Sequence, residues 1–195
     1  MIYFLARVLA YIVLIPLFFV RVKGRKNYKI DSGCVVIANH TSNWDPIVLG
    51  HSILYKPVCY LAKEELFKGK TANWFLTRLN AVPVSRGKGD LKAIKTALSV
   101  LKAGKFLGVF PEGTRSKDGE LLPFEQGAAL MALRAGVPVL PVYIKGTYKP
   151  FRPVTVTIDP PIDLKEITGD KVNSEAINKG TAYLHDKLQE MSERT

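Results

Sequence analysis

The sequence predicts an α/β fold, in which a single mixed, largely parallel sheet is flanked by helices and preceded by an N-terminal membrane-associated helix. Three observations lead to this prediction. Short β-branched runs alternate with longer segments of helical period from residue 33 onward. The first 20 residues are almost wholly apolar. The length, 195 residues, suits one compact domain with a substantial buried core.

Strands are expected where apolar, β-branched runs occur, at 34–38, 57–61, 81–84, 106–110, 138–144 and 153–158. A helix should begin at the N-cap Asp90 and end at Gly104, because apolar residues between them share one face. Another, from about Ser174 to Ser192, repeats apolar residues at helical spacing and should cover the sheet. These elements define the α/β layers of the prediction.

Composition narrows the classes of partner. The chain carries 28 Lys and Arg against 17 Asp and Glu, a formal net charge of +11. Such an excess attracts phosphorylated metabolites, acidic carrier proteins, nucleic acid or a phospholipid surface, and charge alone does not choose among them. Two cysteines are too few for a disulfide-stapled secreted scaffold. Cys34 and Cys59 stand apart in apolar runs, which predicts buried, reduced thiols and a reducing, cytosolic location.

Residues 1–20 would form a helix about 30 Å long, which matches the core of a bilayer. Arg7 and Pro16 interrupt the apolar run, so a tilted or re-entrant arrangement also fits. A basic cluster follows directly and should attract anionic headgroups. Its members are Arg21, Lys23, Arg25, Lys26 and Lys29.

The positive-inside tendency places the rest of the chain in the cytoplasm. We therefore expect residues 1–30 to be a segment associated with the cytoplasmic membrane, and residues 31–195 to form a catalytic α/β domain on its cytoplasmic side. A signal peptide and a buried core helix are the alternative interpretations of the apolar segment.

A polar cluster, Asn39 to Pro46, follows the first strand at its carboxyl end, where α/β sheets bind ligands. His40 is a candidate proton acceptor, and a carboxylate such as Asp45 would fix its tautomer and stabilise the imidazolium. The spacing of five is not a same-face helical spacing, so the pair meets only if the intervening chain turns. The alternative is an ordinary loop in which Asp45 caps the helix beginning near Pro46.

A second polar cluster, Phe110 to Ser116, follows another buried strand. Arg115 has the planar fork that grips phosphate, and Gly113 would let the backbone approach a ligand closely. The alternative is a solvated hairpin over 115–119. Arg86 and Lys63 follow other strands, and would join the same cationic edge if these strands are parallel neighbours.

Other familiar sites are missing from the sequence. It contains no G-x-S-x-G nucleophile elbow, no phosphate-binding P-loop, no complete G-x-G-x-x-G and no H-E-x-x-H zinc helix. His51 and His185 lie in apolar helical stretches, which favours packing roles. We predict no metal site.

In this order, the clusters resemble the motifs of the glycerolipid acyltransferase family, and specifically of the bacterial lysophosphatidic acid acyltransferases. The N-H-x-x-x-x-D motif matches Asn39 to Asp45, and F-P-E-G-T-R-S matches Phe110 to Ser116 without a change. An Arg after a short apolar strand matches Val84 to Arg86, and V-P-x-x-P-V matches Val137 to Val142. The resemblance covers residues 33 to 145.

The resemblance implies a role for each of these residues. His40 would be the general base and Asp45 its orienting partner. The acceptor phosphate would be held by Arg115, Arg86 and Lys63, in a pocket shaped by Glu112, Gly113 and Thr114.

The implied reaction transfers a fatty acyl group from acyl-CoA or an acyl carrier protein to the sn-2 hydroxyl of lysophosphatidic acid. It yields phosphatidic acid for phospholipid biosynthesis at a membrane and needs no cofactor. One alternative keeps fold and chemistry but uses another acceptor, such as glycerol 3-phosphate, a lysophospholipid or a lyso-aminolipid. A remote one is a non-catalytic basic protein that binds membranes or nucleic acid, although the sequence has no nucleic-acid motif and we expect no such partner.

Overall fold

The structure is a computed structural model that describes residues 17–78, 80–84 and 91–195. Within these ranges seven strands form one sheet, in the order β1-β7-β6-β2-β5-β3-β4. They are β1 Arg21–Lys23, β2 Cys34–Ala38, β3 Val58–Lys63, β4 Ala81–Val84, β5 Phe106–Val109, β6 Val139–Lys145 and β7 Thr155–Ile158. All neighbouring strands are parallel except β6 and β7, so the predicted mixed, largely parallel sheet is confirmed.

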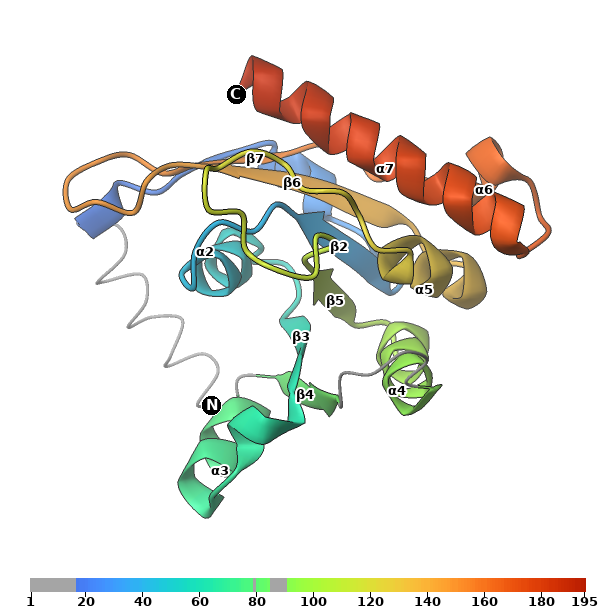
Figure 1. The fold of residues 1–195 in the computed structure, drawn as a ribbon, viewed down its shortest axis with the longest axis horizontal. Coiled ribbons are helices and arrows are strands. Elements are labelled where there is room, and N and C mark those ends of the chain that lie inside the picture. The colour runs from blue at the N-terminus through green and yellow to red at the C-terminus, as the bar shows by residue number, and fades with distance from the viewer. Residues whose placement is uncertain (1–16, 79, 85–90) are drawn as a thin grey trace.

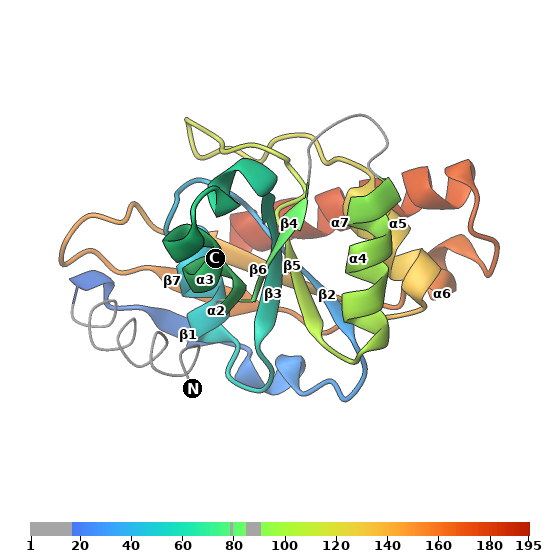
Figure 2. The same cartoon turned by 90° about the horizontal axis from the view of Figure 1, so that it is seen from below.

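Helices cover both faces of this sheet (Figures 1 and 2). The described helices are α2 Asp45–Ser52, α3 Lys70–Arg78, α4 Leu91–Lys102, α5 Gly127–Ala135, α6 Leu164–Thr168 and α7 Ser174–Arg194, with short 3-10 helices η1 Arg25–Tyr28 and η2 Glu64–Phe67. Helices α4, α5 and α7 pack on one face, and α2 packs on the other. A sheet covered on both sides is what near-continuous apolar strands require.

Strand β2 lies at the centre of the sheet and leads directly to the first polar cluster. Its side chains alternate between two cores: Val35 and Ile37 face α4, α5 and α7, whereas Val36 faces α2, and all are fully buried. A Cβ on Gly33 would lie 2.1 Å from the carbonyl oxygen of Leu101, so only glycine lets the chain enter β2 this close to α4. The start of β2 therefore lies directly against α4, and the strand is packed on both faces.

The predicted strands and helices are found with small shifts at their ends. Strand β3 runs two residues further than predicted, and β7 begins at Thr155 rather than at 153. Strand β1 was not predicted, because its alternation of exposed cations with Val22 is typical of surface sequence. Asp90, the predicted N-cap of α4, lies outside the described residues.

The predicted N-terminal helix falls mostly on residues 1–16, outside the described ranges. In the part of the chain that the structure describes, no helix has both the length and the apolarity needed to cross a bilayer. Strand β1 lies within the expected membrane-associated segment 1–30 and pairs with β7, so the sheet already begins in this segment.

Candidate active site

The first polar cluster leaves the sheet beside the second, at the carboxyl edge of β2 and β5. These strands are parallel neighbours, with Ile37 opposite Val109, so the loops that follow them start at the same edge. The chain turns directly after His40 and enters α2 at Asp45. In this turn His40 Nδ1 lies 3.0 Å from Asp45 Oδ2. The imidazole is 18% exposed and the carboxylate fully buried, so the two side chains form a pair open to ligand on the histidine side.

The carboxylate of Asp45 also shapes the turn. Its Oδ2 accepts hydrogen bonds from the backbone amides of Thr41 (2.6 Å) and Ser42 (2.7 Å). These amides precede α2, whose N-cap residue is Trp44 and has no side-chain cap. Asp45 therefore stabilises the loop and orients His40, and it is not the helix cap of the alternative interpretation. With Asp45 accepting from Nδ1, the second ring nitrogen, Nε2, is left as a proton acceptor.

Asn39 fixes the point from which His40 projects. Its side-chain amide donates to the carbonyl oxygen of Ile144 (2.9 Å) and accepts from the Ile144 amide (2.7 Å). These two bonds continue the β2–β6 pairing one residue beyond Ala38, the last residue of β2. Since Asn39 is buried, an unpaired amide here would be costly. The side chain of the motif asparagine thus holds the backbone of β2 against that of β6.

An aromatic stack holds the imidazole in place. The His40 ring stacks on Phe110, with 4.3 Å between ring centroids and 25° between planes. Tyr60 extends the stack from β3, with centroids 6.4 Å from Phe110, and donates its hydroxyl to the carbonyl oxygen of Pro46 (2.8 Å). The stack therefore spans three strands and limits rotation of the histidine.

The loop after β5 holds the His40 backbone through two hydrogen bonds, one to its amide and one to its carbonyl oxygen. Glu112 Oε1 accepts from the His40 amide (2.7 Å), and the Ser116 amide donates to the His40 carbonyl (2.8 Å). Glu112 Oε2 accepts from the amide of Leu122 (3.0 Å), which closes the loop on itself. Glu112 is almost fully buried, and this burial raises the pKa of its carboxyl against the lowering effect of the two amides.

Of the predicted phosphate-binding residues, the structure brings Arg115 to the site. Its Nη1 donates to Asn43 Oδ1 (3.0 Å), in the turn between His40 and Asp45. Two residues before it, Gly113 adopts a left-handed backbone (φ +67°) that reverses the chain, and Thr114 is exposed. The guanidinium therefore stands in solvent beside the dyad.

The structure describes only the backbone of one of the other two predicted cations, and leaves the second outside the described residues. Lys63 is the last residue of β3, which runs parallel to β5, so its backbone reaches the same edge; the structure does not describe its side chain. Arg86 lies outside the described residues. The roles of both stay predictions. Among the described residues, no cluster of His, Cys, Asp or Glu is arranged to hold a metal ion.

Residues 19–145, well over half of the sequence, match the family model described as "Acyltransferase". The chain belongs to the acyltransferase family. The family predicted from the paired motifs is thereby confirmed, and the residues of both motifs fall within the match.

Named relatives of this acyltransferase include two bacterial 1-acyl-sn-glycerol-3-phosphate acyltransferases. The Bacillus subtilis protein is 36% identical over 127 residues, covering 65% of this chain and 63% of that protein. The Streptococcus pneumoniae protein is 30% identical over 172 residues, covering 85% of this chain and 62% of that protein. The chain thus spans less than two thirds of the length of either relative.

A similar solved structure is that of the 1-acyl-sn-glycerophosphate (LPA) acyltransferase PlsC from Thermotoga maritima. It shares 33% sequence identity and a TM-score of 0.69, covering 90% of this chain and 71% of that chain. The acyltransferase fold described above is therefore shared over nearly the whole chain.

Sequence reasoning missed two parts of the candidate site. Tyr148 donates its hydroxyl to Asp45 Oδ1 (2.5 Å) from 103 positions away, and no local motif marks it. Phe110 was included in the motif but was not given a contact with His40. An aromatic residue just past the end of an apolar strand was the available signal, and it did not reveal the partner.

The pKa of Glu112 leads to a prediction for stability. Its pKa is raised above the ordinary 4.5 in the folded protein, so the native state holds this proton more readily than the unfolded chain. The resulting stabilisation is complete below about pH 4.5 and is lost as the pH rises through the folded-state pKa.

We expect the free energy of unfolding of wild type, relative to Glu112→Gln, to fall with rising pH. Urea denaturation of both proteins between about pH 4 and 8 measures this difference. A difference that stays level or rises over this range would contradict the raised pKa.

Proposed function

We propose that this acyltransferase moves a fatty acyl group from a thioester of coenzyme A or an acyl carrier protein to the sn-2 hydroxyl of 1-acyl-sn-glycerol 3-phosphate, making phosphatidic acid. The observation that carries the proposal is the His40–Asp45 pair, 3.0 Å apart at the carboxyl edge of the sheet, with Arg115 beside it. The named relatives support this acceptor, because each has 1-acyl-sn-glycerol 3-phosphate in its name.

In this reaction His40 Nε2 removes the proton of the acceptor hydroxyl as its oxygen attacks the thioester carbonyl carbon. The imidazolium that forms is stabilised by the buried carboxylate of Asp45. The tetrahedral intermediate then collapses, the carbon–sulfur bond breaks, and the departing sulfur takes the proton back from His40. The sequence of steps regenerates the neutral histidine without an acyl-enzyme.

Binding of the acceptor phosphate is assigned to the cationic edge of the sheet. A guanidinium presents paired N–H donors that fit phosphate oxygens, and Arg115 is exposed next to the dyad. We include Lys63 and Arg86 in this phosphate site because Lys63 ends β3 and Arg86 comes two residues after β4, and β3 runs parallel to both β4 and β5. Glu112 contributes by fixing the loop that carries Arg115.

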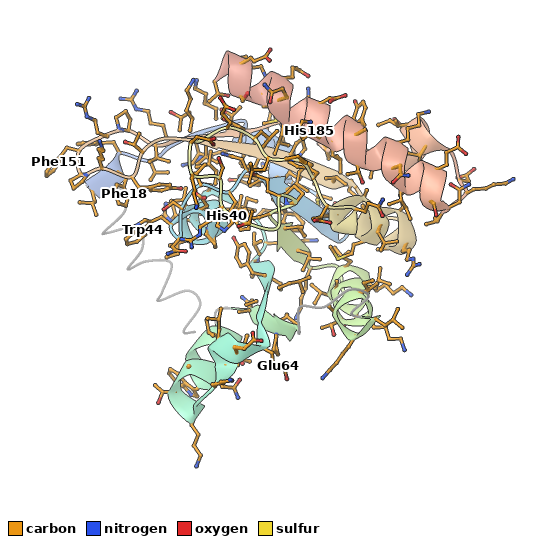
Figure 3. All side chains as sticks on the ribbon, viewed as in Figure 1. Phe18, His40, Trp44, Glu64, Phe151 and His185 are labelled. Carbon is orange, nitrogen blue, oxygen red and sulfur yellow. The ribbon has the colours of Figure 1, made fainter. Side chains whose placement is uncertain are left out.

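His40→Ala should lower turnover by at least about 10²-fold, because a positioned base contributes 10²- to 10⁴-fold. Mass spectrometry of the products formed from lysophosphatidic acid and acyl thioesters measures the rate of phosphatidic acid formation by wild type and by the variant. His185→Ala, a histidine change on α7, is the matched control and should keep full activity (Figure 3), because α7 packs on the face of the sheet opposite to α2. Phosphatidic acid formed at the wild-type rate by the His40 variant would refute the mechanism.

Arg115→Ala should chiefly weaken acceptors that carry a phosphate. We expect kcat/KM to fall about 10-fold or more for lysophosphatidic acid and far less for a monoacylglycerol without phosphate. Arg134→Ala removes the same charge from the last turn of α5 and serves as control. Equal losses for both acceptors would contradict a phosphate role.

The proposal places the enzyme at the cytoplasmic membrane, with the α/β domain on the cytoplasmic side. A surface suited to this position lies where the described chain begins. Phe19 and Phe151 are 46% and 72% exposed and pack against each other, with ring centroids 6.4 Å apart. Both adopt left-handed backbone, with φ +43° and +62°, a conformation that costs about 1–2 kcal/mol per residue.

Exposed cations lie close to this aromatic pair in the sequence. Lys149 and Arg152 flank Phe151, and Arg21 follows Phe19 closely in the chain. Apolar rings framed by cations fit an anionic phospholipid surface. Figure 3 shows Phe151 on the side of the molecule away from His185 and α7. We assign these five residues as the membrane-facing surface.

Phe151→Ser should weaken binding to phosphatidylglycerol vesicles about 10-fold, since a buried Phe contributes about 1.5–3 kcal/mol. Tyr183→Ser, an exposed aromatic residue on α7, is the control and should bind like wild type. Vesicle cosedimentation measures both variants. Unchanged binding of the Phe151 variant would show that this surface does not contact the bilayer.

A further inference from the structure

Tyr148 reaches the catalytic turn from the loop between β6 and β7. Its hydroxyl donates to Asp45 Oδ1, while Oδ2 accepts from Thr41, Ser42 and His40. Tyr148 thus anchors Oδ1 from 103 positions away in the sequence. The two oxygens are therefore held by different parts of the chain, one by the turn and one by a distant loop.

The loop holds Tyr148 in a defined position. Its backbone is left-handed (φ +50°), a conformation that surrounding contacts must stabilise. The Tyr148 ring meets Phe18 edge to face, with centroids 5.5 Å apart and planes at 88°. The same loop is bonded to the chain beside Phe18, because the Phe151 amide donates to Leu17 (2.7 Å) and the Val154 amide donates to Phe18 (2.9 Å).

The hydroxyl also stays a donor. Burial, together with the adjacent carboxylate of Asp45, raises the pKa of Tyr148, so the phenol keeps its proton across the physiological range. A protonated phenol next to a buried carboxylate forms a charge-assisted hydrogen bond, which is stronger than a neutral one.

We propose that Tyr148 is a positioning residue, whose hydroxyl fixes the plane of the Asp45 carboxylate so that Oδ2 faces His40. The inference rests on the proposed acyl transfer. A carboxylate rotates about its Cβ–Cγ bond, and a buried oxygen without a donor would draw it away from this orientation. With Oδ1 anchored by Tyr148, the imidazole keeps the orientation that general-base catalysis requires.

The test is Tyr148→Phe, which removes the hydroxyl and keeps the ring on Phe18. We expect kcat to fall about tenfold while KM for lysophosphatidic acid stays within about twofold, because His40 is misoriented but the acceptor site is intact. Tyr143→Phe is the matched control. That tyrosine lies in β6, packs in the core on the α7 side and interacts with Ser192, so kcat and KM should both be unchanged.

Thermal unfolding of each variant separates positioning from a general loss of structure. A melting temperature near that of wild type together with the selective loss of kcat supports the inference. An unchanged kcat, a loss expressed in KM, or a loss that follows a lowered melting temperature overturns it while acyl transfer by wild type stands. A wild-type protein without acyl transfer overturns the proposed function, and this inference with it.

Discussion

The organisation of the candidate site at this edge of the sheet depends on one buried carboxylate. Asp45 has no exposed side-chain surface, and burying its charge is tolerable only because hydrogen bonds replace the lost water. Two donors are the amides that close the turn, a third is the imidazole and a fourth is a phenol. The same interactions that stabilise the charge therefore give the loop its shape and the histidine its direction.

A second acid, Glu112, holds a different part of His40 from the part that Asp45 holds. Asp45 holds the His40 side chain, whereas Glu112 holds the His40 backbone and the loop that presents Arg115. This division explains why acids recur in both motifs although only one touches the imidazole. It also explains why the two loops must leave neighbouring parallel strands, since one carboxylate bridges them.

Much of the fold and the central pair could be predicted from local sequence. The apolar runs located β2 to β7 because buried parallel strands carry little else, and the polar residues after β2 indicated a turn that would join His40 to Asp45. Strand β1 escaped prediction because three residues at a sheet edge lack a distinctive pattern. The bond from Tyr148 was beyond reach, since it depends on how the loop between β6 and β7 folds back over the turn.

The hydrogen bonds that join Leu17 and Phe18 to the loop of residues 148–154 have a mechanical consequence. They fasten the backbone at Leu17 and Phe18 to the loop whose Tyr148 hydroxyl contacts Asp45. A displacement of the backbone at Leu17 and Phe18 would thus be passed through this loop to the His40–Asp45 pair. The spacing between Phe18 and Asp45 is therefore set by a hydrogen-bonded loop rather than by a flexible connection.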